Sequence, residues 1–159
     1  MDQRSAIVGR GNTIMIAAGK DDTGGRFALL DYELAPGFTS LPPHMHGEED
    51  EAAYVLEGRL LVGIGDTERL VGPGEFVFLP RGIAHMHRNP GQDPVRFLLL
   101  LIPAGFEQCF HDLETLVKTG ASCTPESIAP LLASYGVQAL AHYEAPRHTA
   151  LLPTATSAI

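Results

Sequence analysis

The tripeptide HMH occurs twice in this chain, in HMHGEEDEAAYVLEG (residues 44–58) and in GEFVFLPRGIAHMHRN (residues 74–89). These two copies contain four of the seven histidines of the sequence. Successive side chains of a β-strand alternate between its two sides, so two histidines separated by one residue point to the same side. On strands, each copy would present two imidazoles on one face, and both pairs are candidates for metal binding: His44 with His46, and His85 with His87.

Glycine, proline and carboxylate residues surround the two copies at fixed distances. The first copy is followed by Glu51 and Gly58, and the second lies within a regularly spaced set: Gly74, Pro80, Gly82, His85 and Asn89. At these residues the sequence resembles the two cupin motifs, G(X)5HXH(X)3–4E(X)6G and G(X)5PXG(X)2H(X)3N. The second motif matches at every fixed position. The first departs only at its opening glycine, because six residues rather than five separate Gly37 from His44.

This resemblance covers most of the chain and implies a fold. The motifs span residues 37 to 89, and the flanking segments are similar to small single-domain cupins described as quercetin-dioxygenase-like, which are jelly-roll (double-stranded β-helix) barrels. The residues themselves agree, since Gly and Pro separate many short runs rich in Val, Ile, Leu and Phe. Such spacing is typical of an all-β sandwich or barrel. No segment before residue 104 has a sustained helical period, so βαβ units are not expected.

The hydrophobic pattern changes after residue 104. Apolar side chains recur at helical spacing in residues 106–117, which predicts a helix. Residues 124–136 predict a second helix with Thr124 as its N-cap, kinked or divided at Pro130.

These patterns predict a single domain. Residues 1–103 are expected to form the barrel, residues 104–140 a helical extension packed on it, and residues 141–159 a flexible tail. The sequence leaves open whether the helices cap the barrel mouth or pack outside it.

A metal centre follows from the chemistry of the clustered residues. Two imidazoles on one strand can meet a carboxylate and a third, distant imidazole only if the sheet folds over on itself. Three nitrogens and one oxygen suit one divalent transition metal: Fe, Mn, Ni, Co, Cu or Zn. The resemblance implies His44, His46, Glu51 and His85 as the ligands, with open positions left for a substrate oxygen or O2. The alternative is a polar cluster without metal. The neighbouring acidic residues are expected to form a solvated turn: Glu48, Glu49 and Asp50.

His87 has a separate interpretation. It shares the inward side with His85 but lies about 6–7 Å further along the strand, which is too far to share a metal easily. It is either a catalytic residue that moves a proton or orients the substrate, or a buried histidine bonded to a neighbouring group.

The small side chain of Ala53 suggests one further hypothesis. It shares the inward side with Glu51, where relatives often carry a large aromatic residue. A methyl group there would leave a pocket for a bulky substrate, for example an aromatic one, unless Phe76, Phe78 or His87 fills the space.

Charge and terminal composition exclude several classes of partner. The formal net charge is −8 and no basic cluster offsets it, so neither nucleic acid nor an anionic membrane surface is an expected partner. The N-terminal residues lack the pattern of a signal peptide, and the longest apolar run is too short to cross a bilayer, so a cytoplasmic protein is expected.

The sequence therefore predicts a metal-dependent cupin enzyme. Its substrate would be a small organic molecule, phenolic, polyketide or flavonol-like, and dioxygenase-type chemistry with Glu51 and His87 as catalytic residues is the first hypothesis. The alternatives are an isomerase, cyclase or lyase that does not use O2, and a non-catalytic binding protein. Exposed strand edges favour a homodimer.

Overall fold

The fold consists mainly of strands, in a computed structural model that describes residues 7–9, 11–121 and 124–140. In chain order the elements are β1 (Ile7–Gly9), β2 (Asn12–Ala18), α1 (Lys20–Thr23), β3 (Ala28–Leu34), β4 (His44–His46), β5 (Asp50–Glu57), β6 (Leu60–Ile64), β7 (Thr67–Val71), β8 (Phe76–Leu79), β9 (His85–Arg88), β10 (Val95–Ile102), α2 (Glu107–Lys118), α3 (Pro125–Ser134) and β11 (Val137–Ala139). Among these residues, no helix is both long and apolar enough to span a membrane. The tail predicted to be flexible, residues 141–159, lies outside the described residues.

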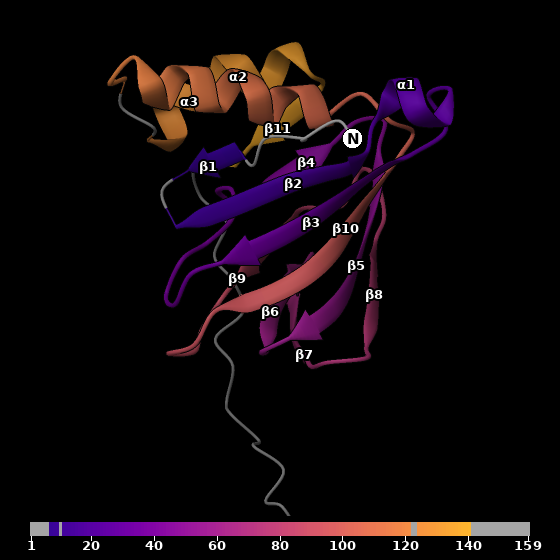
Figure 1. The fold of residues 1–159 in the computed structure, drawn as a ribbon, viewed down its shortest axis with the longest axis vertical. Helices are drawn as coiled ribbons and strands as arrows, with labels where there is room; N and C mark the ends of the chain where they lie inside the picture. Colours follow the sequence, from indigo (N-terminus) through magenta and orange to yellow (C-terminus); the bar gives the residue numbers. More distant parts are fainter. Residues whose placement is uncertain (1–6, 10, 122–123, 141–159) are drawn as a thin grey trace, which may run out of the picture.

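Two antiparallel sheets form the body of the molecule (Figure 1). The strand order is β1-β2-β3-β10-β5-β8 in one sheet and β11-β4-β9-β6-β7 in the other. Strands distant in sequence are neighbours, as β3 is to β10 and β4 to β9. This arrangement confirms the predicted jelly roll with a short helical extension.

Side chains that point alternately inward and outward along the central strands form the core between the sheets. Every second side chain of β10 is buried: Val95, Phe97, Leu99 and Leu101. β3 pairs with β10 along its length and turns its own alternate residues to the same side. Phe97 stacks on Tyr32 of β3 with ring centroids 4.9 Å apart, and both rings are fully buried. The period-2 pattern of these runs therefore sets which side of each strand faces the core.

Asn89, the last residue of the second motif, has a structural role. Its side chain is buried, and its Nδ2 donates to the carbonyl oxygens of Leu34 (2.9 Å) and Asp93 (2.8 Å). Its Oδ1 accepts the backbone N–H of Gly91 (2.9 Å). The asparagine thereby ties the loop after β9 to the end of β3, which explains its place in the motif.

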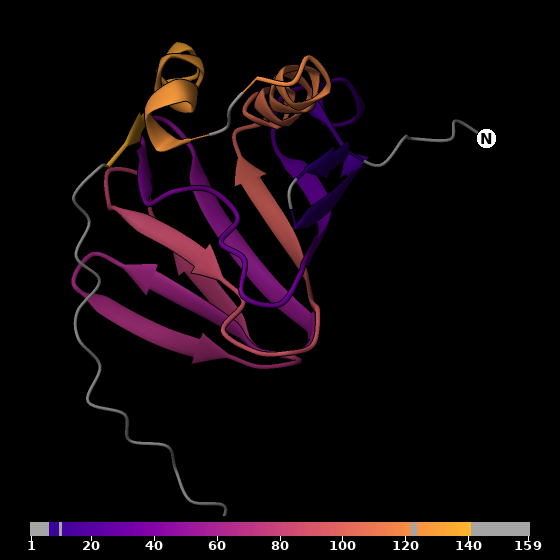
Figure 2. The same ribbon diagram turned by 90° about the vertical axis from the view of Figure 1, so that its left-hand side faces the viewer.

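The two predicted helices are present and lie over one end of the sheets (Figure 2). Thr124 caps α3 as predicted, since its hydroxyl accepts the backbone N–H of Ser127. The helix continues through Pro130 as one element, and its own residues Ile128 and Leu132 are buried. The question left open by the sequence is answered by this placement, because the helices cover an end of the barrel.

Two short elements were not predicted. α1 forms in a segment with the composition of a turn. β11 follows α3 and pairs antiparallel with β4, placing Val137 opposite His46 and Ala139 opposite His44. The helical extension thus ends in a strand beside the first histidine pair.

Candidate metal centre

The first histidine pair is held on β4 between two neighbouring strands. β11 pairs with β4 on one side, and His44 lies opposite His85 of β9 on the other. His44 and His46 are buried, while Met45 between them is half-buried. The alternation predicted from the HMH spacing is therefore present, and both imidazoles enter the barrel.

Four predicted ligands converge at one point inside the barrel. His44, His46, Glu51 and His85 each offer one ligand atom, and these atoms all lie within 4.8 Å of one another. Glu51 Oε1 is 3.1 Å from His46 Nε2, and Glu51 Oε2 is 3.4 Å from His85 Nε2. Each of the four residues is at most 2% exposed. Residues that are 41 positions apart in the sequence are brought together here because β4 and β9 are neighbours in one sheet.

The histidine rings are oriented so that every Nε2 faces this point. Nδ1 of His44 donates to the Pro42 carbonyl (2.8 Å) and Nδ1 of His85 donates to the Ile83 carbonyl (2.9 Å). A carbonyl can only accept, so in the neutral rings the proton is on Nδ1 and the lone pair is on Nε2. Ring orientation by the second nitrogen in this way is usual for histidines that bind metals.

The inward-facing atoms are buried without hydrogen-bond partners, which provides a test of whether a metal fits. Four of them are unpartnered: Nε2 of His44, His46 and His85, and Oε2 of Glu51. Buried polar atoms are nearly always satisfied, and several unsatisfied atoms around one point require an explanation. One divalent cation would satisfy all of them, and three imidazole nitrogens with one carboxylate oxygen form a suitable donor set. The residues therefore fit a bound transition metal, although the donor set does not identify which one.

Glu49 was predicted to lie in a solvated turn, and that prediction is wrong. The residue is only 8% exposed, and its Oε2 lies 3.2 Å from Nδ1 of His46. Glu49 therefore orients His46 as the carbonyls orient the other two rings. For its neighbours the structure is closer to the prediction, since Glu48 is exposed and Asp50 pairs with Arg81 at the surface.

Burial and neighbouring charges shift the pKa values of the residues in and beside the centre in different directions. Burial lowers the pKa of His44 to about 3 and that of His87 to about 4. Burial also acts to lower the pKa of His46, but the carboxylates of Glu49 and Glu51 outweigh it and raise the pKa to about 9. Burial acts to raise the pKa of Glu51, yet the adjacent histidines hold it well below its ordinary value. A charged carboxylate and neutral imidazoles are the forms that bind metal ions, so a metal at this centre must displace the proton that the two carboxylates favour on His46.

His87 lies beside the centre and outside the group of four. Its Nε2 is 3.9 Å from Glu51 Oε2 and has no hydrogen-bond partner. Its Nδ1 is 3.5 Å from the Ser40 hydroxyl, at the limit of a hydrogen bond. The ring is buried next to Phe97. Both interpretations from the sequence thus have support, and the catalytic role stays a prediction.

Phe106 closes one side of the centre, a role that the sequence did not reveal. Its ring meets His46 edge-on with centroids 4.5 Å apart, and it is 1% exposed. Phe106 precedes α2 and also packs on Phe110 and on Tyr135 at the end of α3. The only signal in the sequence was its helical spacing, which indicates a buried residue without saying what it covers.

A cavity of about 290 Å³ lies between the helices and the larger sheet, close to the centre. Its lining includes Tyr32 and Ser40, and Ser40 contacts His87 as described above. Ala53 lines neither this cavity nor a second, polar one near α1. Ala53 is instead fully buried in the core, opposite Val77. The predicted pocket beside Ala53 is not one of these two cavities and stays a prediction.

Comparison with known proteins agrees with this centre. The chain matches the family described as Cupin domain over residues 30–101, which include all four clustered residues. Germin-like protein subfamily 2 member 3 of Arabidopsis thaliana is 35% identical over 85 residues, a match that covers 50% of this chain and 37% of that protein. The matches to the first curated relatives span only about a third of their length.

Two solved structures are similar in fold as well as in sequence. The polyketide cyclase RemF from Streptomyces resistomycificus is 30% identical with a TM-score of 0.52, over 64% of this chain and 70% of that one. A recombinant oxalate oxidase in complex with glycolate is 27% identical with a TM-score of 0.51, over 60% and 53% of the two chains. The two motifs, the antiparallel barrel and these matches agree, and the chain belongs to the cupin superfamily.

Proposed function

We propose that this protein is a metal-dependent enzyme that acts on a small organic molecule, with dioxygenase-type oxidation as its reaction class. The observation that carries the proposal is the set of buried, unpartnered ligand atoms from His44, His46, Glu51 and His85, next to a cavity. A divalent metal held there would supply Lewis-acid activation and open positions for substrate oxygen or O2. The resemblance to an oxalate oxidase supports oxidation as the class of reaction.

The protein's own residues have separable tasks in this proposal. Glu51 Oε2 and His87 Nε2 lie 3.9 Å apart on the inner surface, where either can accept a substrate proton. Phe106 excludes water from the side of His46. Ser40 lines the cavity and contacts His87, so it connects bound substrate with the proton-accepting pair.

A second candidate is an isomerase, cyclase or lyase reaction that does not consume O2. The proximity of His87 and Glu51 favours it, because two groups that can hold a proton suffice for a non-redox proton transfer. The resemblance to a polyketide cyclase supports the same class.

Oxygen dependence of turnover distinguishes these candidates. The purified protein is loaded separately with Fe²⁺, Mn²⁺ or Ni²⁺ and incubated with a panel of flavonols and other phenols, in air and under strict anaerobiosis. We expect product only in air, with O2 uptake in step with product. Product formed equally without O2 would replace oxidation by the second candidate. Binding without product in either atmosphere would overturn the proposal that the protein is an enzyme.

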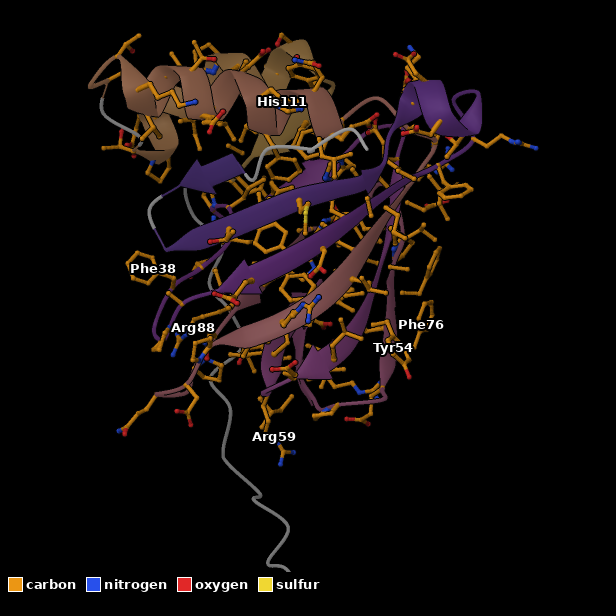
Figure 3. The ribbon with its side chains drawn as sticks, in the orientation of Figure 1. Phe38, Tyr54, Arg59, Phe76, Arg88 and His111 are labelled. Carbon is orange, nitrogen blue, oxygen red and sulfur yellow. The ribbon has the colours of Figure 1, made fainter. Side chains whose placement is uncertain are left out.

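We also propose that the protein forms a homodimer through the outward side of β5 and β8. Tyr54, Phe76 and Phe78 are 42%, 55% and 47% exposed on this side, and Tyr54 lies opposite Phe76 (Figure 3). Taking about 200 Å² for each ring, they expose roughly 300 Å² of apolar surface. That is the size of a patch that marks an interface, and it supplies over a third of the about 800 Å² per partner in a stable dimer. The adjacent, half-buried Leu98 and Leu100 extend it.

The mass in solution tests this surface. We expect the wild type at micromolar concentration to have twice the chain mass of 17.0 kDa. The double variant Phe76→Asp, Phe78→Asp is expected to be a folded monomer, because both rings are exposed and charges oppose their burial. Leu70→Asp, an exposed position on the other sheet, is the matched control and should stay dimeric. A monomeric wild type would contradict the proposal.

A further inference from the structure

The cavity beside the metal centre has an apolar and partly aromatic wall. It lies between α2 and α3 on one side and β2, β3 and the following loop on the other, and its apolar lining includes Ile14, Leu41, Phe110, Leu113 and Ile128. Its volume of about 290 Å³ is at the lower end of small-molecule sites. Phe38, which is 43% exposed, also lines it and lies at the end of the molecule where β2 and β3 meet their loops (Figure 3).

Two buried polar atoms belong to side chains that line this cavity and have no hydrogen-bond partner. One is the hydroxyl of Tyr32, a residue that is 1% exposed; the Ser40 side chain lies near it, but without the geometry of a hydrogen bond. The other is Oδ1 of Asn12, whose Nδ2 donates to the Ser40 carbonyl (3.1 Å). Leaving such a group unsatisfied costs about 1–3 kcal/mol, so structures rarely keep two without a use.

The two side chains lie on the same face of the larger sheet. Ile14 of β2 lies opposite Tyr32 of β3, and Asn12 is two residues before Ile14 on the same side of the sheet. Asn12 and Tyr32 are therefore diagonal neighbours on one face, at a typical separation of about 7–8 Å. A ligand hydroxyl between them can donate to Asn12 Oδ1 and accept from the Tyr32 hydroxyl.

The inner end of the cavity is near the metal centre. Ser40 lines the cavity and its hydroxyl is 3.5 Å from His87 Nδ1, while His87 Nε2 is 3.9 Å from Glu51 Oε2. The side chains of Ser40 and His87 therefore connect this cavity with Glu51, one of the four clustered residues.

The charge of the lining restricts the ligand further. No Lys, Arg or His is among the described residues that line the cavity. Glu114 is its single carboxylate and is paired with Lys118 (3.0 Å). A phosphate or carboxylate placed there would lose its hydration without gaining a cation, which is strongly unfavourable.

We propose that this cavity binds a neutral aromatic molecule through a hydroxyl group held between Tyr32 and Asn12, and that it rejects phosphorylated and carboxylated molecules. The inference rests on the proposed function and names its substrate class. It also makes the closing helices, whose Phe110, Leu113 and Ile128 form one wall, part of the binding site.

Calorimetric titration of the full chain with three probes of similar size tests the inference: 2-naphthol, naphthalene and 2-naphthoate. We expect 2-naphthol to bind, and the other two to bind at least about tenfold more weakly, the effect of one hydrogen bond or one unpaired charge. Tyr32→Phe should weaken 2-naphthol binding toward that of naphthalene, because one of the two hydrogen bonds to the ligand hydroxyl is lost and the one to Asn12 stays. The same variant should unfold no earlier than wild type, because the hydroxyl that it removes has no partner. Tyr54→Phe, on the outer side, is the control and should bind as wild type.

Three further variants test whether 2-naphthol binds in this cavity and whether its binding depends on the metal. Leu113→Trp fills the wall of the cavity and should abolish binding, and Val117→Trp repeats the test if the first variant does not fold, since both residues are only half-buried. His85→Ala should keep 2-naphthol binding after losing metal. Equal binding of 2-naphthoate, or 2-naphthol binding that survives both tryptophan variants, would overturn the inference. A protein that binds metal but not 2-naphthol would overturn it too, leaving the metal centre intact.

Discussion

Replacing His85 with alanine is expected to remove the bound metal from the purified protein. Wild type should carry about one equivalent of a first-row transition metal per chain, the number that one set of converging ligands can hold. Loss of the imidazole removes one of three nitrogens and leaves the buried charge of Glu51 with one fewer histidine beside it. We expect the affinity for metal to fall by more than about 100-fold, beyond the effect of changing a group that only orients a ligand.

Elemental analysis and thermal unfolding measure this loss independently. At metal concentrations about 100 times the Kd, binding stabilises a folded protein by about 2.7 kcal/mol. For a chain of this length that raises the Tm by roughly 5–10 °C. Added metal should produce this rise in wild type and no rise in His85→Ala.

Two other variants serve as comparisons for the loss of metal affinity in His85→Ala. Glu49→Gln keeps all four ligands but weakens the contact that orients His46, so metal affinity should fall by about 10–100-fold. His111→Ala, on α2 and outside the group of four, should leave metal content unchanged. If His85→Ala retained metal as well as His111→Ala does, the proposed ligand set would be wrong.

Gly58→Ala is expected to have the largest effect on stability among the motif glycines. Gly58 has φ +76°, and a Cβ there would lie 2.8 Å from both the Pro94 carbonyl oxygen and Val95 Cγ2. The backbone conformation alone costs about 1–2 kcal/mol for a residue with a side chain. The clash with backbone at the start of β10 adds to it, and we expect a loss of about 3 kcal/mol or more.

Gly74→Ala provides the matched control. Gly74 has a similar φ of +82°, but a Cβ there would meet no atom within 4 Å. It should cost only the conformational part, about 1–2 kcal/mol. Urea unfolding of both variants in the same metal state compares them directly. Equal losses would mean that the contact with Pro94 and Val95 is relieved by a small shift, and that Gly58 is required only for its backbone conformation.

The metal ligands were predictable from the resemblance to the cupin motifs, and local rules support part of the set. Side chains alternate along a strand, which places His44 and His46 on one side. The spacing in the first motif places Glu51 on the next strand, on its inward side. Asn89 and Gly58 were recognisable from the same spacings, although their physical roles, a loop tie and a close approach to β10, became visible only in the structure.

Other features depended on contacts that no spacing encodes. Glu49 belongs to a run of acidic residues with the composition of a solvated turn, and its burial follows from how β4 and β5 are joined. The hypothesis about Ala53 depends on such contacts too, because a small inward side chain leaves a pocket only if nothing packs into the space, and Ala53 is fully buried in the core.

The sequence by itself determined which faces of the strands are buried, since these follow from periodicity, and its resemblance to the cupin motifs indicated the barrel and the four residues that converge in it. Only the tertiary structure decided where the open space lies, what surrounds the centre and what closes it. Ser40, His87 and Phe106 meet around that centre from a loop, a strand and the start of a helix. Their proximity depends on how two sheets and a helical extension pack together, a long-range property that local pattern does not contain.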